Sequence, residues 1–470
     1  MTTTTRALLP LATALLLSSC GGSDTATRSS ASPDATAPTA ASTDALRGTG
    51  CGWQAASDAD TANIAFPDKA ARYWVALVPA TPGTRLRLNG VYPDARYFSF
   101  NAYDAALRPT DAIADRDLMP DAGSRNPFSQ AGVTPGGRYT AFLAFGPAPE
   151  TRAANTFFSG QVGAGPLQLP NGGLVAIIYR TYVAKGERQD GNVPLPLLTL
   201  ESADGRSLGT LPTCSEPLLP NFGGLAPRSG LNAAINEADY PDQLASPFPT
   251  AVYPPVTRVF YGLPDTTINI IGDQTGLSGQ LPAPPATGGG GFLSNIHNDY
   301  TTSAFARRYG NLFLMRAKAP GFRSQPGRAF GNEPLRYWSL CQNEFATQRY
   351  TDCSLDADTP VDADGFFTVA ISDPADRPQR ATAGDGVTWL PWGAYPDGVL
   401  LYRQMLADDG YAQAIKRVPK GTPLTEVMGE FAPQVTYCRP EVFDRADLKT
   451  AAARFKACQD DQQANPVSTP

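Results

Sequence analysis

A pattern of nine residues occurs twice in this chain and limits its fold more than any other sequence feature. The first copy, Arg96–Asp104, reads RYFSFNAYD, and the second, Arg336–Glu344, reads RYWSLCQNE. Each copy has an Arg, two aromatic residues, a Ser, an apolar residue and a final acidic residue. Repetition on this scale indicates one structural unit that is built twice.

Three further pairs of segments are similar and keep the same order in both halves. The pairs are residues 71–79 with 307–315, 139–144 with 367–372, and 173–180 with 398–403. Their aromatic and β-branched residues favour strands. Because the order is shared, we predict a mainly β protein with tandem duplicated β-sandwich domains and short C-terminal helices.

The composition agrees with a turn-rich β protein. The chain has 470 residues, 42% of them hydrophobic, with 44 Gly and 44 Pro, which is enough apolar content for two or three cores. Hydrophobic spacing predicts short strands at 257–261 and 267–271 and helices at 408–418 and 440–458. The expected division is a signal peptide at 1–20, a disordered tether at 21–48, a first sandwich at 49–214, a partly ordered Pro- and Gly-rich connector at 215–291, a second sandwich at 292–420 and a helical extension at 421–470.

The N-terminus has the features of an exported lipoprotein. The apolar run from Ala7 to Leu17 is too short to span a bilayer and is typical of a signal peptide. The sequence up to Cys20 resembles a bacterial lipobox, in which that Cys is lipidated, and Gly21 follows where an inner-membrane protein usually has Asp. This resemblance implies a lipid anchor in the outer membrane, facing the periplasm or the cell surface. The alternative is an ordinary cleaved signal with an unrelated Cys.

The overall charge argues against two classes of partner. The net charge is −6 and the isoelectric point is about 5.1. An acidic chain lacks the basic surface that nucleic acids require. It would also be repelled by anionic lipid, so peripheral membrane binding is not expected beyond the lipid anchor.

Besides Cys20, six cysteines remain, and an even number in an exported protein favours disulfides. Six cysteines allow fifteen pairings. We predict the pairs Cys51 with Cys214, Cys341 with Cys353, and Cys438 with Cys458. Zinc is the alternative ligand, but the chain has one His and no CxxC pair, so no zinc site is expected.

Two features suggest nucleophilic catalysis, and each has a plainer interpretation. Gly205–Gly209 fits the GxSxG pattern of serine hydrolases, but Asp204 and Gly205 together are typical of a hairpin turn. His297 is the only histidine, so any Ser-His or Cys-His site would have to use it. We interpret it primarily as a loop residue, and a functional role is the alternative.

Two acidic loops would suit calcium, whose ligands are hard oxygens. One loop carries Asp111, Asp115, Asp117 and Asp121, and the other carries Asp352, Asp356, Asp358, Asp362 and Asp364. Neither ends in the bidentate Glu of an EF-hand. We therefore interpret both primarily as solvated loops, with calcium as the alternative.

Aromatic residues are the best sequence candidates for ligand contact. Trp389, Trp392 and Tyr395 lie in a segment rich in Pro and Gly, where indole rings are expected to be exposed. The further candidates flank the repeated pattern and are His297, Asp299, Arg336 and Trp338. The recurring arginines are Arg96 and Arg336 with Arg180 and Arg403. We expect them to pair with buried acids or to cap backbone carbonyls, and binding of an anionic ligand is the alternative. Asp104, Asp299, Glu333 and Glu344 are the carboxylates that a glycosidase mechanism would draw on.

The segments 364–372, 388–391 and 399–403 resemble the bacterial jelly-roll family known as domain of unknown function 1214. The resemblance covers residues 335–405 well and 96–182 loosely, since Phe157 and Phe158 stand in place of its Trp-Leu-Pro turn. It implies a jelly-roll sandwich and no particular reaction.

These observations predict a non-catalytic protein of the cell envelope that binds a glycan or a small molecule, either near Trp389–Tyr395 or where the two repeats meet. The alternative is a carbohydrate-active hydrolase or lyase that uses carboxylates and tyrosines.

Overall fold

The computed structural model describes residues 50–60, 63, 65–81, 83–104, 108–160, 174–215, 250–277, 293–323, 333–345 and 348–467. All of them belong to a unit that spans Ser42–Pro470. The predicted signal peptide, Cys20, the tether and the four glycines at 288–291 lie outside the described residues. In the described part of the chain, no helix is long and apolar enough to cross a membrane.

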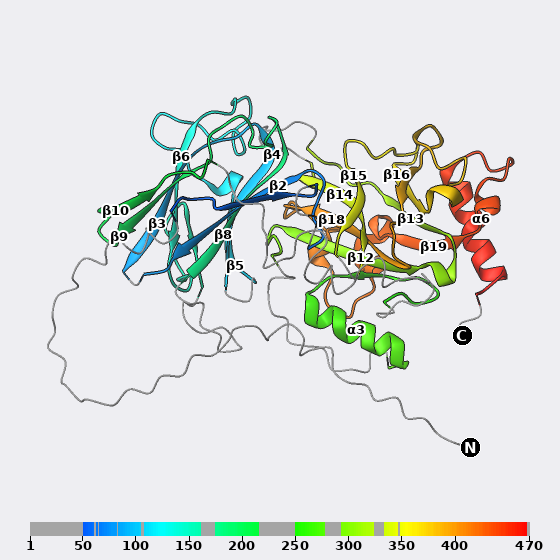
Figure 1. The fold of residues 1–470 in the computed structure, drawn as a ribbon. Coiled ribbons are helices and arrows are strands. Elements are labelled where there is room, and N and C mark those ends of the chain that lie inside the picture. The colour runs from blue at the N-terminus through cyan, green and yellow to red at the C-terminus, as the bar shows by residue number, and fades with distance from the viewer. Residues whose placement is uncertain are drawn as a thin grey trace, which may run out of the picture. The chain divides into compact units, whose positions relative to one another are not determined.

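Two five-stranded sheets form the first sandwich, in the orders β1-β2-β8-β4-β5 and β10-β9-β3-β6-β7 (Figure 1). The strands are β1 (Ala55–Asp58), β2 (Ala71–Pro79), β3 (Thr84–Val91), β4 (Ala95–Tyr103), β5 (Pro109–Ala114), β6 (Arg138–Ala144), β7 (Thr156–Phe158), β8 (Leu174–Ala184), β9 (Leu197–Ser202) and β10 (Ser207–Leu211). In β3, buried residues alternate with partly exposed ones, as in a strand with one face on a core. Every residue of β4 is buried, so both of its faces are covered.

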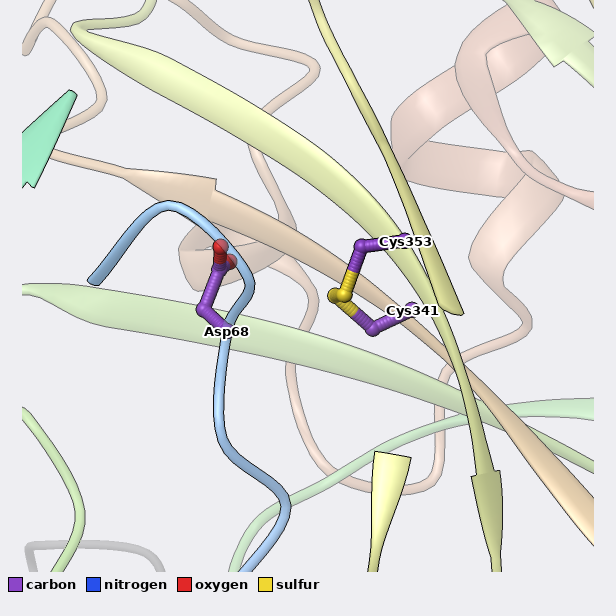
Figure 2. A group of neighbouring side chains, drawn as sticks. All are labelled: Asp68, Cys341 and Cys353. Atoms are coloured by element: carbon purple, nitrogen blue, oxygen red, sulfur yellow. A yellow bond between two sulfur atoms is a disulfide. The ribbon is translucent and has the colours of Figure 1, made fainter. Parts of the chain in front are cut away.

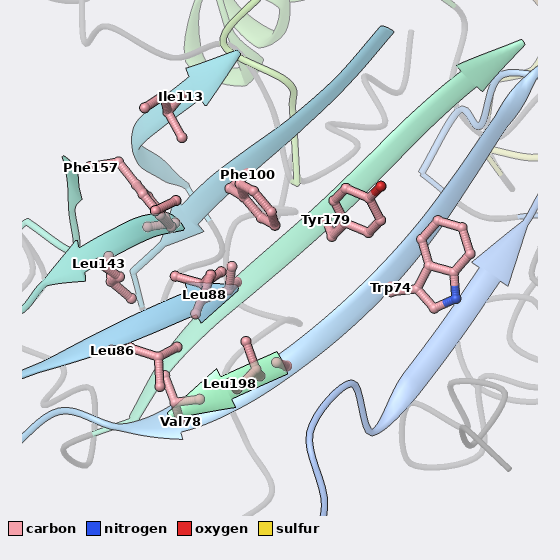
Figure 3. Close-up of a cluster of buried hydrophobic side chains, with 14 of the residues drawn as sticks. Trp74, Val78, Leu86, Leu88, Phe100, Ile113, Leu143, Phe157, Tyr179 and Leu198 are labelled. Carbon is pink, nitrogen blue, oxygen red and sulfur yellow. The ribbon is translucent and has the colours of Figure 1, made fainter. Parts of the chain in front are cut away.

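Aromatic rings fill the core of the first sandwich (Figure 3). Phe100 of β4 stacks on Tyr179 of β8 with ring centroids 5.2 Å apart. Tyr179 also stacks on Trp74 of β2 at 5.3 Å. Leu88 of β3 and Leu143 of β6 belong to the same buried cluster. Burial of these large apolar groups is the main source of stability for the sandwich.

The second sandwich has sheets in the orders β11-β12-β18-β14-β15 and β17-β16-β13-β19. The strands are β11 (Thr257–Val259), β12 (Asn298–Ala306), β13 (Leu312–Lys318), β14 (Tyr337–Glu344), β15 (Tyr350–Leu355), β16 (Phe366–Ser372), β17 (Thr388–Pro391), β18 (Asp397–Met405) and β19 (Gln434–Cys438). The predicted duplicated β-sandwich is therefore confirmed, and β11 confirms the strand expected at 257–261.

The two sandwiches correspond strand by strand. The order β1-β2-β8-β4-β5 matches β11-β12-β18-β14-β15, and β9-β3-β6-β7 matches β19-β13-β16-β17. Even the parallel pairing of β6 with β7 recurs between β16 and β17. Among the described strands, β10 alone has no counterpart.

One predicted segment match is wrong. Residues 71–79 form β2, whose counterpart is β12, whereas residues 307–315 hold the 3-10 helix η3 (Arg307–Tyr309) and the start of β13. The similarity arose because both segments have Arg-Tyr as their second and third residues, Arg72-Tyr73 and Arg308-Tyr309. The other three pairs lie on equivalent strands.

Two helix and strand predictions are also wrong. Residues 267–271 lie inside the helix α3 (Leu263–Thr275), which has Pro264 in its first turn and ends at Gly276 in the left-handed conformation, with φ of 72°. Residues 408–418 contain only the 3-10 helix η6 (Ile415–Arg417). Asp408 Oδ1 accepts a hydrogen bond from Gly410 N at 2.7 Å, which turns the chain where the helix was expected.

The segment expected to be helical at 440–458 holds two helices, α5 (Pro440–Phe443) and α6 (Ala451–Ala464), with Thr450 capping α6. The strand β19 lies before them, in the predicted helical extension. The remaining short elements are η1 (Asp115–Asp117), η4 (Pro374–Asp376), η5 (Ala383–Asp385), α4 (Leu424–Met428) and η7 (Gly429–Phe431).

All three predicted disulfides are confirmed. Cys341 and Cys353 lie directly opposite each other on β14 and β15. Cys438 ends β19 and Cys458 lies on α6, so their bond fixes the helix against the sheet. The remaining bond joins Cys51 to Cys214 across 163 residues. With these sulfurs bonded, the alternative of zinc ligation by cysteine thiolates does not apply to this structure.

Candidate binding site

Two ion pairs join the sandwiches reciprocally. Arg96 of β4 pairs with Asp356, which follows β15, and Arg336, which precedes β14, pairs with Asp115, which follows β5. The four side chains are at most 3% exposed. Since β4 corresponds to β14, the arginine of each repeat binds the acid of the other. The preferred interpretation of the recurring arginines, pairing with buried acids, is confirmed for Arg96 and Arg336.

The segments that precede β2 and β12 make a second reciprocal contact. Asp68, before β2, accepts hydrogen bonds from the Tyr337 hydroxyl at 2.9 Å and the Ser339 hydroxyl at 2.6 Å. Asn295, before β12, donates its Nδ2 to the Tyr97 hydroxyl at 3.1 Å. Tyr97 and Tyr337 are the second residues of the two repeated patterns. Each pattern therefore binds the segment that precedes β2 or β12 in the other repeat.

Arginines of the two central strands complete this contact. Arg180 of β8 donates to the Leu293 carbonyl, and Arg403 of β18 donates to the Phe66 carbonyl. Arg180 also donates to the hydroxyl of Tyr103, which itself donates to the Ser294 carbonyl at 2.8 Å. Residues 293–295 are therefore fixed on the first sandwich by several buried bonds.

A pocket of about 220 Å³ lies beside this fixed segment. Three parts of the second repeat form its wall: the end of β11 and the residues after it, the entry into β12, and η6. The lining residues are Val259, Phe260, Tyr261, Ser294, Asn295, Ile296, Asn298, Asp299, Tyr300, Ile415, Lys416 and Val418. Ile296 is 43% exposed, which is unusual for a large apolar residue. The pocket combines an acid, several rings and an exposed aliphatic side chain.

Asp299 is the one carboxylate among the described residues that line this pocket. It lies opposite Gln404 in the pairing of β12 with β18, and Gln404 Oε1 accepts a hydrogen bond from Ile415 N at 2.9 Å, which holds η6 beside it. Burial raises the pKa of Asp299 to about 6, although the charge of Lys416 acts in the opposite direction. In the described part of the chain, its carboxylate has no hydrogen bond or ion pair to a side chain or backbone group.

Two further polar atoms of the lining lack a partner among the described residues. They are Asn298 Oδ1 and Ser294 Oγ. Asn298 is 8% exposed, and its Nδ2 donates to the Tyr300 hydroxyl at 3.1 Å. Buried polar atoms are nearly always hydrogen-bonded, so unpartnered acceptors in a pocket wall indicate a site for a donor.

The predicted exposed aromatic segment is buried, which corrects the expectation for Trp392 and Tyr395. Trp392 is 1% exposed and Tyr395 is 3% exposed. The Trp392 ring meets Phe305 edge to face, with centroids 4.5 Å apart. Trp389 is half-buried on β17, and its Nε1 donates to Ser372 Oγ at 3.0 Å. These rings serve the second sandwich and do not line the pocket.

Arg336 and Trp338 also have structural roles and lie outside the pocket. Arg336 is held by Asp115, as described above. Trp338 is 1% exposed in the second core, with its Nε1 donating to the Pro320 carbonyl at 3.1 Å. Neither residue contributes to the pocket lining.

His297 lies between two lining residues but belongs to the contact with the first sandwich. Its Nδ1 is 2.8 Å from the Tyr97 hydroxyl. Burial, together with the charges of Arg116 and Arg180, lowers its pKa to about 3, so the ring is neutral at physiological pH. Of the seven predicted ligand-contact residues, only Asp299 lines the pocket.

Asp68, Cys341 and Cys353 lie close together (Figure 2), with their potential ligand atoms within 4.8 Å of one another. The two sulfurs are bonded to each other and offer no thiolate. The Asp68 carboxylate accepts bonds from Tyr337 and Ser339. This group is therefore a structural contact between the two sandwiches.

Several acids of the two loops that were considered for calcium already form ion pairs with arginines. Asp356 and Asp115 form the crossed ion pairs, Asp362 pairs with Arg316, and Asp111 pairs with Arg152 at 2.9 Å. A calcium ion would have to compete with these arginines.

The GxSxG pattern spans the turn between β9 and β10, with Gly205 at φ of 85°, as expected for a hairpin.

A larger hollow of about 590 Å³ lies beside α5 and α6. Its charged residues already form ion pairs: Arg439 with Asp461, Lys456 with Asp460, and Arg445 with Asp447 outside the lining. We therefore consider the smaller pocket at Asp299, with its unpartnered acceptors, the better candidate.

The sequence did not point to Phe260, Tyr261, Ser294 or Lys416 as site residues. These residues come from three segments that are far apart in the chain, and no spacing pattern connects them. The hydrophobic residue Ile296 next to polar neighbours in a loop is the one signal that would have drawn attention to this region.

No family model matches the chain. A search of curated proteins also finds no match. Among solved structures, an uncharacterised protein from Burkholderia cenocepacia is similar over 83% of each chain, with 15% identity and a TM-score of 0.41. The VPA0106 protein from Vibrio parahaemolyticus is similar over 79% of this chain and 89% of its own, with 13% identity and a TM-score of 0.34. At these TM-scores the likenesses support no inference, and the resemblance to the jelly-roll family stays a prediction.

Proposed function

We propose that this protein is an exported, outer-membrane-anchored lipoprotein that binds a small molecule without transforming it, in the pocket beside Asp299. The proposal of export and anchoring rests on the lipobox-like sequence at Cys20, and three disulfides accord with an oxidising compartment. The observation that carries the binding proposal is a pocket lined by two kinds of acceptor. Asp299 is a partly buried carboxylate without an ion pair to a described residue, and Asn298 Oδ1 is buried and has no partner among the described residues.

The surroundings of the pocket favour binding. Ser294 and Asn295 form part of its wall and are fixed by hydrogen bonds to the first sandwich. A preformed wall lowers the entropy lost on binding, because the side chains need no ordering. The second sandwich supplies the remaining wall through β11, β12 and η6.

The alternative of a carbohydrate-active hydrolase has less support from this pocket. Glycoside hydrolysis commonly uses two carboxylates on either side of the bond that is cleaved. The lining contributes one, Asp299. A lyase that uses Tyr261 or Tyr300 would need an ionisable hydroxyl, and the Tyr261 hydroxyl is already donated to the Val418 carbonyl at 3.0 Å.

Native mass spectrometry tests the proposal. The soluble form that begins after Cys20 would be purified from its own host, together with Asp299→Asn and the matched control Asp364→Asn. Asp364 is an exposed acid of the turn before β16, remote in sequence from the pocket residues. We expect a retained additional mass in the wild type and in Asp364→Asn, and its loss in Asp299→Asn. Bare protein in every sample, or an adduct that Asp299→Asn retains, would contradict the proposal.

A further inference from the structure

Of the polar groups in the pocket wall that lack a partner among the described residues, Ser294 Oγ can donate or accept a hydrogen bond, and the others are acceptors only. The Asp299 carboxylate and Asn298 Oδ1 can only accept hydrogen bonds from a ligand. The donor side of the Asn298 amide is already used by the Tyr300 hydroxyl. A ligand that satisfies these atoms must therefore donate, and an anionic ligand would face an uncompensated carboxylate.

Among the described residues of the lining, Lys416 is the one cation, and its ammonium group binds other acceptors. Its Nζ donates to the Ala407 carbonyl at 2.8 Å and pairs with Asp409 at 3.1 Å. Lys416 still acts on Asp299 through space, since it lowers the pKa of that carboxyl. It does not form an ion pair with Asp299, so the carboxylate remains open to a cation from outside.

Aromatic rings surround the same space. Phe260 and Tyr300 meet edge to face with centroids 6.2 Å apart, and Tyr261 follows Phe260 in the lining. Arg403 already lies over the Tyr300 ring, with its guanidinium carbon 5.7 Å from the centroid. Ring faces attract cations, and this attraction strengthens when water is excluded. Ile296 and Val259 add apolar surface for a carbon skeleton.

We infer that the ligand is a small organic ammonium ion, whose nitrogen lies at Asp299 and whose carbon groups contact the aromatic rings. This inference rests on the proposed function, since it names the class of ligand for the same pocket. A volume of about 220 Å³ lies below the 300–1,000 Å³ typical of sites for drug-sized ligands, so the ligand is small.

Isothermal titration calorimetry with charged and neutral isosteres tests this inference. Butylamine would be compared with butanol, and propylamine with propanol, all at pH 7.5. We expect at least one ammonium compound to bind at least about tenfold more tightly than its neutral isostere. The Asp299→Asn variant should lose that preference, and Asp364→Asn should keep it.

The outcomes separate the two proposals. Equal binding of the charged and neutral partners, or binding of neither, would overturn the inference of an ammonium ligand. If the host-derived adduct seen by native mass spectrometry depends on Asp299 but is neutral or anionic, the inference fails while the binding function stands. If no adduct is found and no compound binds, both proposals fail.

Discussion

Arg96 and Asp356 form a buried ion pair although 260 positions separate them in the sequence. Arg96 Nη1 lies 2.6 Å from Asp356 Oδ2. The counterpart pair, Arg336 with Asp115, repeats the contact in the opposite direction. The duplication therefore supplies the contact between its own two copies: the first residue of each repeated pattern binds the acid of the other repeat.

Replacing Arg96 by Met should lower the free energy of unfolding by about 3–5 kcal/mol, because Asp356 would remain buried without its partner. Urea denaturation of the soluble form would measure the change. Arg206→Met is the matched control, since Arg206 is exposed in the turn between β9 and β10, and it should be nearly neutral.

The double variant Arg96→Met with Asp356→Asn should lose less stability than the sum of the two single variants, since the uncompensated charge is gone. Simple additivity of the two effects would show that the residues do not interact and would contradict the assignment.

Asp299→Asn should stabilise the protein at neutral pH. The carboxyl has a pKa of about 6 in the folded chain against an ordinary value of 3.8, so the folded state binds the proton more tightly and ionisation opposes folding. The destabilisation caused by ionised Asp299 is absent below about pH 4, grows between pH 4 and 6, and is complete above pH 6. At pH 7 the variant should be more stable by on the order of 2 kcal/mol.

Thermal unfolding of wild type and Asp299→Asn at pH 4 and pH 7 would check the sign. The two proteins should unfold at similar temperatures at pH 4 and separate at pH 7. A variant that is less stable than the wild type at pH 7 would show that a group of the protein holds the ionised Asp299. A gain in stability with a loss of binding is the pattern expected of a functional site.

Trp392→Ala should lower the unfolding free energy by about 3–5 kcal/mol, because the indole fills the core against Phe305. Trp389→Ala should have a smaller effect, since its ring is half-buried. Chemical denaturation of both variants would measure the difference. Equal, small effects would mean that Trp392 is exposed in solution and would restore it as a candidate for ligand contact.

Removal of the bond between Cys51 and Cys214 by a double replacement with Ser should lower stability by about 2–5 kcal/mol. This bond closes the longest loop, with a sequence separation of 163, against 12 for Cys341 with Cys353. On the chain-entropy account, the double replacement at Cys341 and Cys353 should have the smaller effect. The reverse order, measured by urea denaturation, would indicate that packing around the bonds dominates over loop closure.

Much of the fold could be predicted because the sequence patterns that recur lie within equivalent strands of the two sandwiches. The repeated patterns fall on β4 and β14, and Phe157 and Phe158 lie on β7 where the second repeat has β17. The failures have local causes. The β-branched residues at 267–271 suggested a strand, but a helix begins at Leu263 and continues to Gly276. Local propensity gave way to this longer element.

The site was less predictable, for a different reason. Pro391 and Gly393 suggested an exposed turn around Trp392, yet the parallel pairing of β16 with β17 carries that indole into the core. Conversely, the pocket depends on the tertiary approach of η6 to β12, where a hydrogen bond from Ile415 N to Gln404 of β18 holds η6. Sequence alone singled out Asp299 through its position beside the repeat, and it could not show which rings would surround it.

The most direct test of the central claim is a crystal structure of the soluble protein purified from its own host without added ligand. We predict electron density for a small molecule between Asp299 and the rings of Phe260, Tyr261 and Tyr300, with an atom at hydrogen-bonding distance from the Asp299 carboxylate. Density for ordered water alone in this pocket, with a bound molecule elsewhere or none at all, would contradict it.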